Sequence, residues 1–216
     1  MATLHEIADI RKDYKLKSFS ESDASIDPFN QFQIWWEDAA KSDIEEYNAM
    51  TVASVDDNGR PSARIVLLKG FSDEGFIFYT NFQSKKGKEI LARPQVALVF
   101  FWKELERQVR IEGKCEVVSD ELSDAYFTSR PIKSKIGAWA SPQSTVLSDR
   151  TQLDEAFKLY ENKYSDNNIP RPPHWGGFIV KPDLFEFWQG RRSRLHDRIQ
   201  YTLENNNKWI RSRLAP

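Results

Sequence analysis

The stretch AMTVASVDDNGRPSARIVLLK at residues 49–69 decides the fold class. Both ends of this stretch are rich in aliphatic and β-branched residues, which favour strands. Asn58-Gly59 between them supplies the left-handed backbone conformations that a tight hairpin turn needs. Two strands joined by so short a turn pair antiparallel. The sequence therefore predicts an antiparallel β structure here.

Further strands and several helices are predicted on both sides of this hairpin. Apolar residues at helical spacing indicate helices that begin after three predicted N-caps, Asp27, Ser84 and Ser148. The same spacing indicates helical structure over 119–139. Turn compositions separate the remaining apolar runs. The fold class predicted is mainly β with flanking helices (α+β), arranged as a barrel. The additional strands are expected at 75–80, 95–102, 107–118, 176–180, 184–188, 193–203 and 208–214.

The domain organisation predicted from the chain is simple. Residues 1–25 mix charge, serine and aspartate without sustained periodicity, which is typical of a flexible N-terminal arm. No internal repeat or low-complexity linker follows. We therefore expect a single domain over 26–216.

Composition excludes several classes of function. The chain has 216 residues, one cysteine and three histidines, so neither an internal disulfide nor a Cys/His metal site is expected. The formal net charge of -1 argues against a general nucleic-acid binder. No secretion signal and no apolar run of membrane-spanning length is evident, so we expect a soluble cytoplasmic protein. Nucleotide-loop and nucleophile-elbow motifs are absent, and Cys115 is interpreted as a structural thiol.

Basic side chains gather in four places that could hold an anionic ligand. In the strand predicted at 193–203, alternation puts Arg194, His196 and Arg198 on one face. Arginine forks match phosphate or carboxylate oxygens, although a solvated strand face is the alternative interpretation. The other three groups are Arg64 with Lys69, Lys85 with Lys86 in the first turn of a helix, and Tyr126, Arg130 and Ser134 at four-residue spacing.

These groups, taken in chain order, resemble the pyridoxine/pyridoxamine 5'-phosphate oxidase family. The resemblance runs from about residue 28 to the last residue. It implies a split β-barrel that binds FMN and works as a homodimer, with FMN at the subunit interface. The residues that carry it are RIVLLK (64–69), FYTN (78–81), SKKGKEI (84–90), LERQVRIEG (105–113), SRPIKSKIGAWAS (129–141), QS (143–144), FWQG (187–190), RLHDR (194–198) and RLAP (213–216).

The resemblance also implies roles for individual residues. Arg194 and His196 would be catalytic and lie against the substrate pyridine, while Arg191 and Arg192 receive no role and are interpreted as surface charge. Lys85-Lys86 stands where the family usually has arginine then lysine, so a fork becomes a point charge. Substrate contacts would be Lys69, Tyr126, Arg130, Ser134, Arg194 and His196, with Arg11 and Tyr14 from the arm. FMN contacts would be Arg64, Ile65, Val66, Leu67, Leu68, Lys69, Tyr79, Thr80, Lys85, Lys86, Gln108, Gln143, Ser144, Trp188 and Arg198.

The activity implied is oxidation of pyridoxamine 5'-phosphate or pyridoxine 5'-phosphate to pyridoxal 5'-phosphate. FMN would take a hydride from the substrate, and dioxygen would reoxidise it to give hydrogen peroxide. Two alternatives stay open at this point. One is a related split-barrel protein that binds flavin, haem or a deazaflavin without this oxidase activity; the other is a nucleic-acid-binding barrel that uses the arginine row.

Overall fold

The structure is a computed structural model that describes residues 13, 14 and 16–216. The described chain divides into two compact units. The first contains the residues up to Tyr47, Val99–Ile111 and Asp183–Pro216, and the second contains Asn48–Leu98 and Glu112–Pro182. A single domain with a flexible arm over residues 1–25 stays a prediction.

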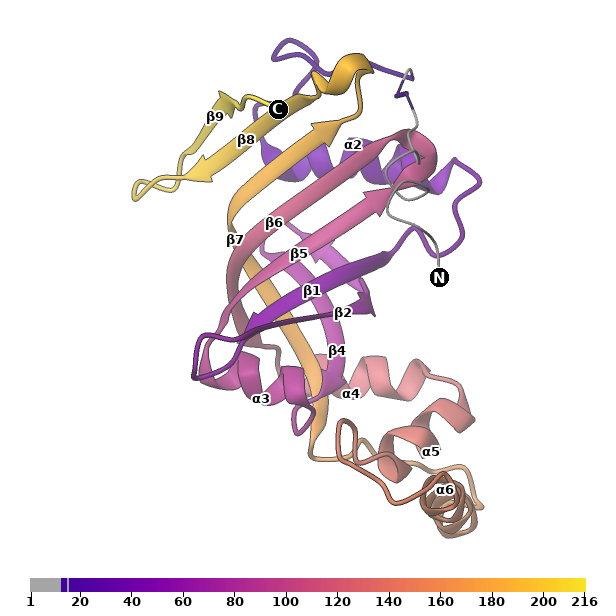
Figure 1. Ribbon diagram of the computed structural model, residues 1–216. Coiled ribbons are helices and arrows are strands. Elements are labelled where there is room, and N and C mark those ends of the chain that lie inside the picture. The colour runs from indigo at the N-terminus through magenta and orange to yellow at the C-terminus, as the bar shows by residue number, and fades with distance from the viewer. Residues whose placement is uncertain (1–12, 15) are drawn as a thin grey trace. The chain divides into compact units, whose positions relative to one another are not determined.

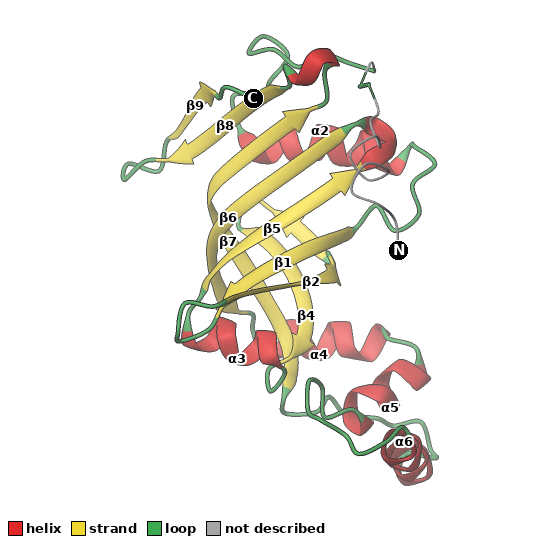
Figure 2. Ribbon diagram, viewed as in Figure 1, coloured by secondary structure: helices red, strands yellow, loops and turns green. Residues whose placement is uncertain are grey.

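The described chain contains a nine-stranded sheet with helices beside it, which confirms the mainly β fold class with flanking helices (Figures 1 and 2). Its order is β2-β1-β5-β6-β7-β4-β3, and β8 pairs with β7 and β9. Every pair for which the register is given is antiparallel, including the predicted hairpin, in which Val52 lies opposite Arg64. The strands are β1 (Ala49–Val55), β2 (Pro61–Leu67), β3 (Gly70–Ser72), β4 (Gly75–Asn81), β5 (Gln95–Trp102), β6 (Arg107–Val117), β7 (Trp175–Gln189), β8 (Asp197–Leu203) and β9 (Trp209–Arg213).

The first unit is built around helix α2 (Pro28–Ala40). Asp27 caps it as predicted, because its side chain accepts a hydrogen bond from the Asn30 amide. The apolar face of α2 packs on strand residues of the same unit: Phe32 lies 5.2 Å from Phe100, and Trp35 lies 5.3 Å from Phe187, between ring centroids. These aromatic contacts bury large flat side chains and fix the helix on the sheet.

The second unit carries the other α-helices of the described residues, which connect its strands (Figure 2). Ser84 caps α3 by accepting a hydrogen bond from the Gly87 amide, as predicted. The prediction of Ser148 as a cap is wrong, because α6 begins after Arg150 and has no side-chain cap. The Asp149 carboxylate, not Ser148, accepts the hydrogen bond of the Thr151 amide. The helices are α3 (Lys85–Ala92), α4 (Asp120–Ser129), α5 (Ile132–Ala140) and α6 (Thr151–Lys163).

Two predicted strand boundaries are also wrong. Residues 176–188 form one continuous strand, β7, where a turn at Lys181-Pro182 was expected. Gly113 of β6 lies against this point, and a Cβ atom there would be 2.2 Å from the Lys181 carbonyl oxygen. The missing side chain leaves room for the strand to continue through the proline.

The strand predicted over 193–203 starts only at Asp197. The residues before it form a short 3₁₀ turn, Arg192–Arg194, in which Ser193 and Arg194 have left-handed φ values of 57° and 61°. Strand alternation therefore does not place Arg194 and His196 on one face with Arg198.

The described residues contain no candidate for a membrane-spanning helix or a metal site. None of their helices is both long and apolar enough to cross a membrane. No group of three or more of their His, Cys, Asp and Glu side chains could hold a metal ion.

Candidate active site

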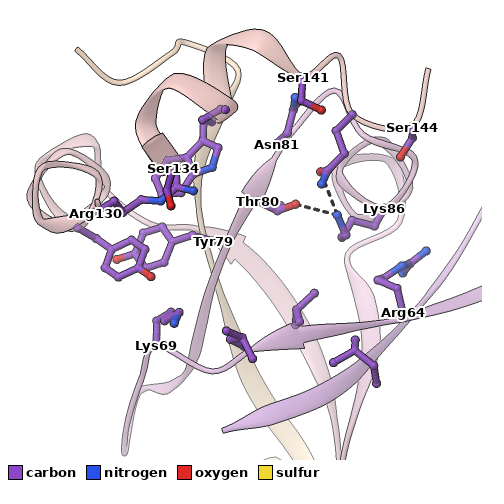
Figure 3. A pocket seen from close by; sticks show the side chains of 18 of the residues that line it. Arg64, Lys69, Tyr79, Thr80, Asn81, Lys86, Arg130, Ser134, Ser141 and Ser144 are labelled. Carbon is purple, nitrogen blue, oxygen red and sulfur yellow. Dashed lines mark hydrogen bonds between the residues drawn. The ribbon is translucent and has the colours of Figure 1, made fainter. Parts of the chain in front are cut away.

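An open cavity of about 970 Å³ lies in the second unit, and most of its walls come from residues singled out in the sequence. Figure 3 shows Arg64 and Lys69 on one side of it, Tyr79 and Thr80 on β4, and Arg130 and Ser134 on the other side. The predicted residues that line it are Arg64, Ile65, Val66, Leu67, Lys69, Tyr79, Thr80, Lys85, Lys86, Tyr126, Arg130, Ser134, Gln143 and Ser144. Leu68 is not among the lining residues and is buried in the core.

Tyr126, Arg130 and Ser134 reach this cavity by a different route from the one predicted. They do not share one helix, because α4 ends at Ser129 and α5 begins at Ile132 after Pro131. A proline at this position ends the first helix and redirects the chain. The three side chains nevertheless line the same cavity.

Lys86 is the centre of a polar cluster at the start of α3. Its Nζ donates to Thr80 Oγ1 at 2.9 Å and to Gln143 Oε1 at 3.2 Å (Figure 3). Burial, and after it the nearby charge of Arg64, lowers the pKa of Lys86. Lys85 and Lys86 lie in the first turn of α3, where free backbone amides and the partial positive charge of the helix N-terminus add to the attraction for an anion. The cluster is therefore suited to bind a phosphate group.

Arg64 is held beside this cluster by a buried carboxylate that sequence reasoning missed. The guanidinium donates to Ser54 Oγ and Ser62 Oγ, each at 2.6 Å, and to Glu89 Oε2 at 3.3 Å. Both serine hydroxyls also donate to Glu89 Oε2 at 2.6 Å. Burial acts to raise the pKa of Glu89, but these serine hydrogen bonds, Arg64 and Lys85 together lower it, so the carboxylate is ionised. The only signal in the sequence is the spacing of Lys85 and Glu89, four residues apart.

Arg130 provides an incompletely paired cation at another part of the cavity. Its guanidinium lies 4.7 Å from the ring centroid of Trp175, and its NH1 atom is buried without a hydrogen-bond partner among the described residues. Burial lowers the pKa of Arg130. Lys69 and the stacked rings of Tyr79 and Tyr126, 4.0 Å apart, line the cavity as well. A buried donor without a partner costs free energy, so this arrangement favours an anionic ligand.

The remaining candidate residues that the structure describes lie in the first unit. The ring of His196 lies 4.6 Å from Trp188 and 5.8 Å from Tyr14. Trp188 of β7 lies opposite Arg198 of β8, whose Nε donates to Glu186 at 2.8 Å. Gln108 belongs to β6. Arg11 lies outside the described residues.

Cys115 belongs neither to the residues that line the cavity nor to the candidate residues of the first unit. It is buried in β6, and this burial raises the pKa of its thiol to about 12. A thiol that stays protonated at neutral pH is a poor nucleophile. This agrees with its interpretation as a structural residue.

Two family models cover most of the chain. Residues 36–164 match the model of pyridoxamine 5'-phosphate oxidase, and residues 175–216 match the pyridoxine 5'-phosphate oxidase C-terminal dimerisation region. The chain belongs to the pyridoxamine 5'-phosphate oxidase family. The resemblance stated from the sequence motifs is thereby confirmed.

Full-length relatives of the chain carry the name of the same family. A protein of Acaryochloris marina named pyridoxine/pyridoxamine 5'-phosphate oxidase is 53% identical over 214 residues, which is 99% of this chain and 97% of that protein. A protein of Trichormus variabilis with the same name is 52% identical, over 97% of this chain and 98% of its own length.

Solved structures confirm the split-barrel fold expected for the family. PhzG from Burkholderia lata, in complex with tetrahydrophenazine-1-carboxylic acid, has a TM-score of 0.86 and 26% identity, covering 93% of this chain and 99% of its own. A pyridoxamine 5'-phosphate oxidase-related, FMN-binding protein from Nostoc punctiforme has a TM-score of 0.69 at 16% identity, covering 89% and 100% of the two chains.

Apart from Tyr14, the candidate residues that the structure describes belong to regions that the family models match. The cavity residues from Arg64 to Ser144 lie in the first matched region. Trp188, Arg194, His196 and Arg198 lie in the dimerisation region. The second group is thus part of the segment that the family uses for dimerisation.

Proposed function

We propose that the protein is an FMN-dependent oxidase that converts pyridoxamine 5'-phosphate or pyridoxine 5'-phosphate to pyridoxal 5'-phosphate. Dioxygen would be reduced to hydrogen peroxide, and the amine substrate would release ammonia. The observation that carries the proposal is a single cavity with two separate cationic groups, Lys86 with Arg64 and Arg130 with Lys69. Cofactor and substrate each bring one phosphate, so the proposal uses both groups.

The residues present fit FMN. Arg64, Lys85, Lys86 and Thr80 would hold its phosphate, because they combine cations, a hydroxyl and a helix N-terminus. Strand β2 lines the cavity beside them with Ile65, Val66 and Leu67, whose aliphatic surface suits a flat ring system. Gln143 and Ser144 would contribute further polar contacts. When bound, FMN supplies the hydride acceptor and passes the electrons on to dioxygen.

The other cationic group would select the substrate. Arg130 and Lys69 would bind the substrate phosphate, together with the hydroxyl groups of Tyr126 and Ser134. A phosphate fixed at one end restricts where the reacting carbon can lie. Such positioning can contribute several kcal/mol to lowering the barrier.

The C-terminal group would complete the site in a homodimer with FMN at the subunit interface. The support is that Trp188, Arg194, His196 and Arg198 lie in the region matched as the family's dimerisation region. Trp188 and Arg198 would contact FMN, while Arg194 and His196 would face the substrate ring. Arg11 and Tyr14 would add contacts from the N-terminal arm.

A spectrum and a product assay together test this function. Purified protein reconstituted with FMN should show flavin absorption that bleaches when pyridoxamine 5'-phosphate is added without oxygen. Admission of oxygen should restore the absorption and release hydrogen peroxide. Protein that cannot be reconstituted with FMN would refute the cofactor, and flavin that never bleaches with either vitamin substrate would refute the substrate.

The similarity to PhzG gives a second candidate function, oxidation of a reduced phenazine carboxylic acid. A ligand of that class carries a carboxylate instead of a phosphate, and arginine binds either group, so Arg130 alone does not separate the two candidates. The vitamin substrates are favoured because the relatives named pyridoxine/pyridoxamine 5'-phosphate oxidase are 52–53% identical to this chain, whereas PhzG is 26% identical. The same bleaching assay with tetrahydrophenazine-1-carboxylic acid separates the two candidates. We expect bleaching with pyridoxamine 5'-phosphate and none with the phenazine compound.

The role of Arg64 gives a prediction about the cofactor alone. Arg64→Ala removes a charge-assisted contact to the FMN phosphate, worth about 1.5–3 kcal/mol, so the dissociation constant of FMN should rise roughly 10- to 100-fold. Titration of apoprotein with FMN, followed by flavin fluorescence, measures it. Arg93→Ala is the control, because Arg93 is a surface arginine that pairs with Asp57 and does not line the cavity. Equal affinities of wild type and Arg64→Ala would exclude this placement of the phosphate.

A further inference from the structure

The turn that precedes β8 brings a backbone amide onto the ring of His196. The Arg191 N–H donates to His196 Nδ1, with 3.1 Å between the two nitrogens. Two consecutive residues of this turn, Ser193 and Arg194, have left-handed φ values of 57° and 61°. Such backbone conformations cost free energy for residues other than glycine and persist where the surrounding structure requires them.

This hydrogen bond fixes the tautomer of the imidazole. A nitrogen that accepts a hydrogen bond from an amide must carry its lone pair, so Nδ1 has no proton. A neutral imidazole carries one proton, which must then be on Nε2. Nε2–H is therefore a donor, and neither ring nitrogen is free to accept a proton from a substrate.

The surroundings favour this neutral state. Burial, and after it the positive charge of Arg194, lowers the pKa of His196, while the charge of Asp197 acts in the opposite direction and does not reverse the shift. The rings of Trp188 and Tyr14 pack beside the imidazole. Protonation would place a second proton on Nδ1, directly opposite the Arg191 amide. At neutral pH the ring thus stays uncharged.

Asp197 holds the turn that carries this amide. Its Oδ2 accepts from Arg191 NH1 and from the Phe19 amide, each at 3.0 Å, and its Oδ1 accepts from Arg213 NH1 at 3.0 Å. Three segments of the first unit therefore meet at one carboxylate. Arg191, interpreted above as surface charge, is bound to Asp197 through its side chain and to His196 through its backbone amide.

We propose that His196 serves the reaction as a hydrogen-bond donor through Nε2–H, and that Arg191 and Asp197 are positioning residues that set this tautomer. The proposal rests on the proposed function in one respect, namely that a substrate ring lies at His196. It assigns His196 to orienting the substrate and stabilising charge on it, and excludes His196 as the general base.

The tautomer can be measured without any activity. Holoenzyme labelled with ¹⁵N and free of substrate, at neutral pH, should show a protonated Nε2 and an unprotonated Nδ1 for His196, assigned by comparison with the His196→Gln variant. Asp197→Ala should weaken this preference, so that the Nδ1–H tautomer becomes detectable. A wild-type ring with Nδ1 protonated would overturn the proposal, whatever the enzyme oxidises.

Two substitutions then separate the ring nitrogens in function. In His196→Gln, the side-chain amide NH₂ can occupy the position of Nε2–H. The shorter side chain of His196→Asn brings its amide only to the position of Nδ1. One neutral hydrogen bond is worth about 0.5–1.5 kcal/mol, so kcat/KM for pyridoxamine 5'-phosphate should be roughly 3- to 10-fold higher for Gln than for Asn. Both variants should keep the FMN affinity of the wild type.

The outcomes of these experiments are distinct. Equal kcat/KM values, or a more active Asn variant, would refute the donor role. Wild-type protein that oxidises no vitamin substrate would refute the proposed function, while the ¹⁵N measurement would still decide the tautomer.

Discussion

Arg130 shows most directly how a single residue links packing to substrate choice. Its NH1 atom is buried without a hydrogen-bond partner among the described residues, while its guanidinium lies over Trp175. Arg130→Met should raise the Michaelis constant for pyridoxamine 5'-phosphate about 10- to 100-fold, since it removes a charge-assisted hydrogen bond of about 1.5–3 kcal/mol. The free energy of unfolding should stay the same or rise, because a desolvated charge is replaced by an apolar chain.

Steady-state kinetics and denaturant unfolding measure these two effects. Arg150→Met is the matched control, because the Arg150 side chain is exposed on the surface and forms an i,i+4 ion pair with Asp154. An exposed pair of this kind contributes little, so both quantities should stay close to wild type. A large loss of stability in Arg130→Met, with an unchanged Michaelis constant, would contradict the role of Arg130 as a ligand.

Residue types and motifs predicted the cavity wall better than they predicted the groups behind it. Lys69, Arg130 and Lys86 were found because their charge and order are visible in the sequence. Glu89 was missed because a glutamate in a lysine-rich helix is typical of a solvated surface. Its importance comes from burial and from hydrogen bonds to Ser54 and Ser62, which are distant in sequence.

Helix α3 tests whether an element contributes to cofactor binding as well as to stability. Ser84 is fully buried and caps the helix, and its Oγ also donates to the Asn81 carbonyl at 2.6 Å. Ser84→Ala should lower the free energy of unfolding by about 1–2 kcal/mol. It should also weaken FMN binding. The first turn of α3 holds Lys85 and Lys86 at the proposed phosphate site, and loss of the cap lets this turn fray.

Ser119 offers the matched control for this prediction. It caps α4 in the same way, by accepting a hydrogen bond from the Leu122 amide at 3.2 Å, but it does not line the cavity. Ser119→Ala should lose comparable stability and keep its FMN affinity. Denaturant unfolding of the apoproteins and FMN titration give the two quantities. Equal FMN affinities in both variants would show that α3 binds no phosphate.

At the scale of elements, local signals located most strands and helices but failed where tertiary contacts decide. The Asn-Gly hairpin and the Asp27 and Ser84 caps act through neighbouring residues, so the sequence shows them. The continuation of β7 through Pro182 depends on Gly113 of another strand. The left-handed turn before β8 depends on contacts of Asp197 with two other segments.

At the scale of the whole molecule, the resemblance of the sequence motifs to a known family predicted the split barrel. That the cavity group and the C-terminal group form one active site stays a proposal. The cavity of the second unit and the group around His196 belong to different units of the chain. In a homodimer the two groups of one site can come from different protomers. The match of residues 175–216 to the dimerisation region supports this arrangement.

Mixed dimers test this arrangement. Arg130→Met impairs the cavity group and Arg194→Ala impairs the C-terminal group, so each variant alone should have low activity. If each site uses both protomers, subunits exchanged at equal amounts should recover roughly a quarter of wild-type activity, since half of the dimers are mixed and each of these has one intact site. Size-exclusion chromatography should show dimers throughout. Activity that never exceeds that of the separate variants, although tagged subunits confirm the exchange, would mean that each site is built within one protomer.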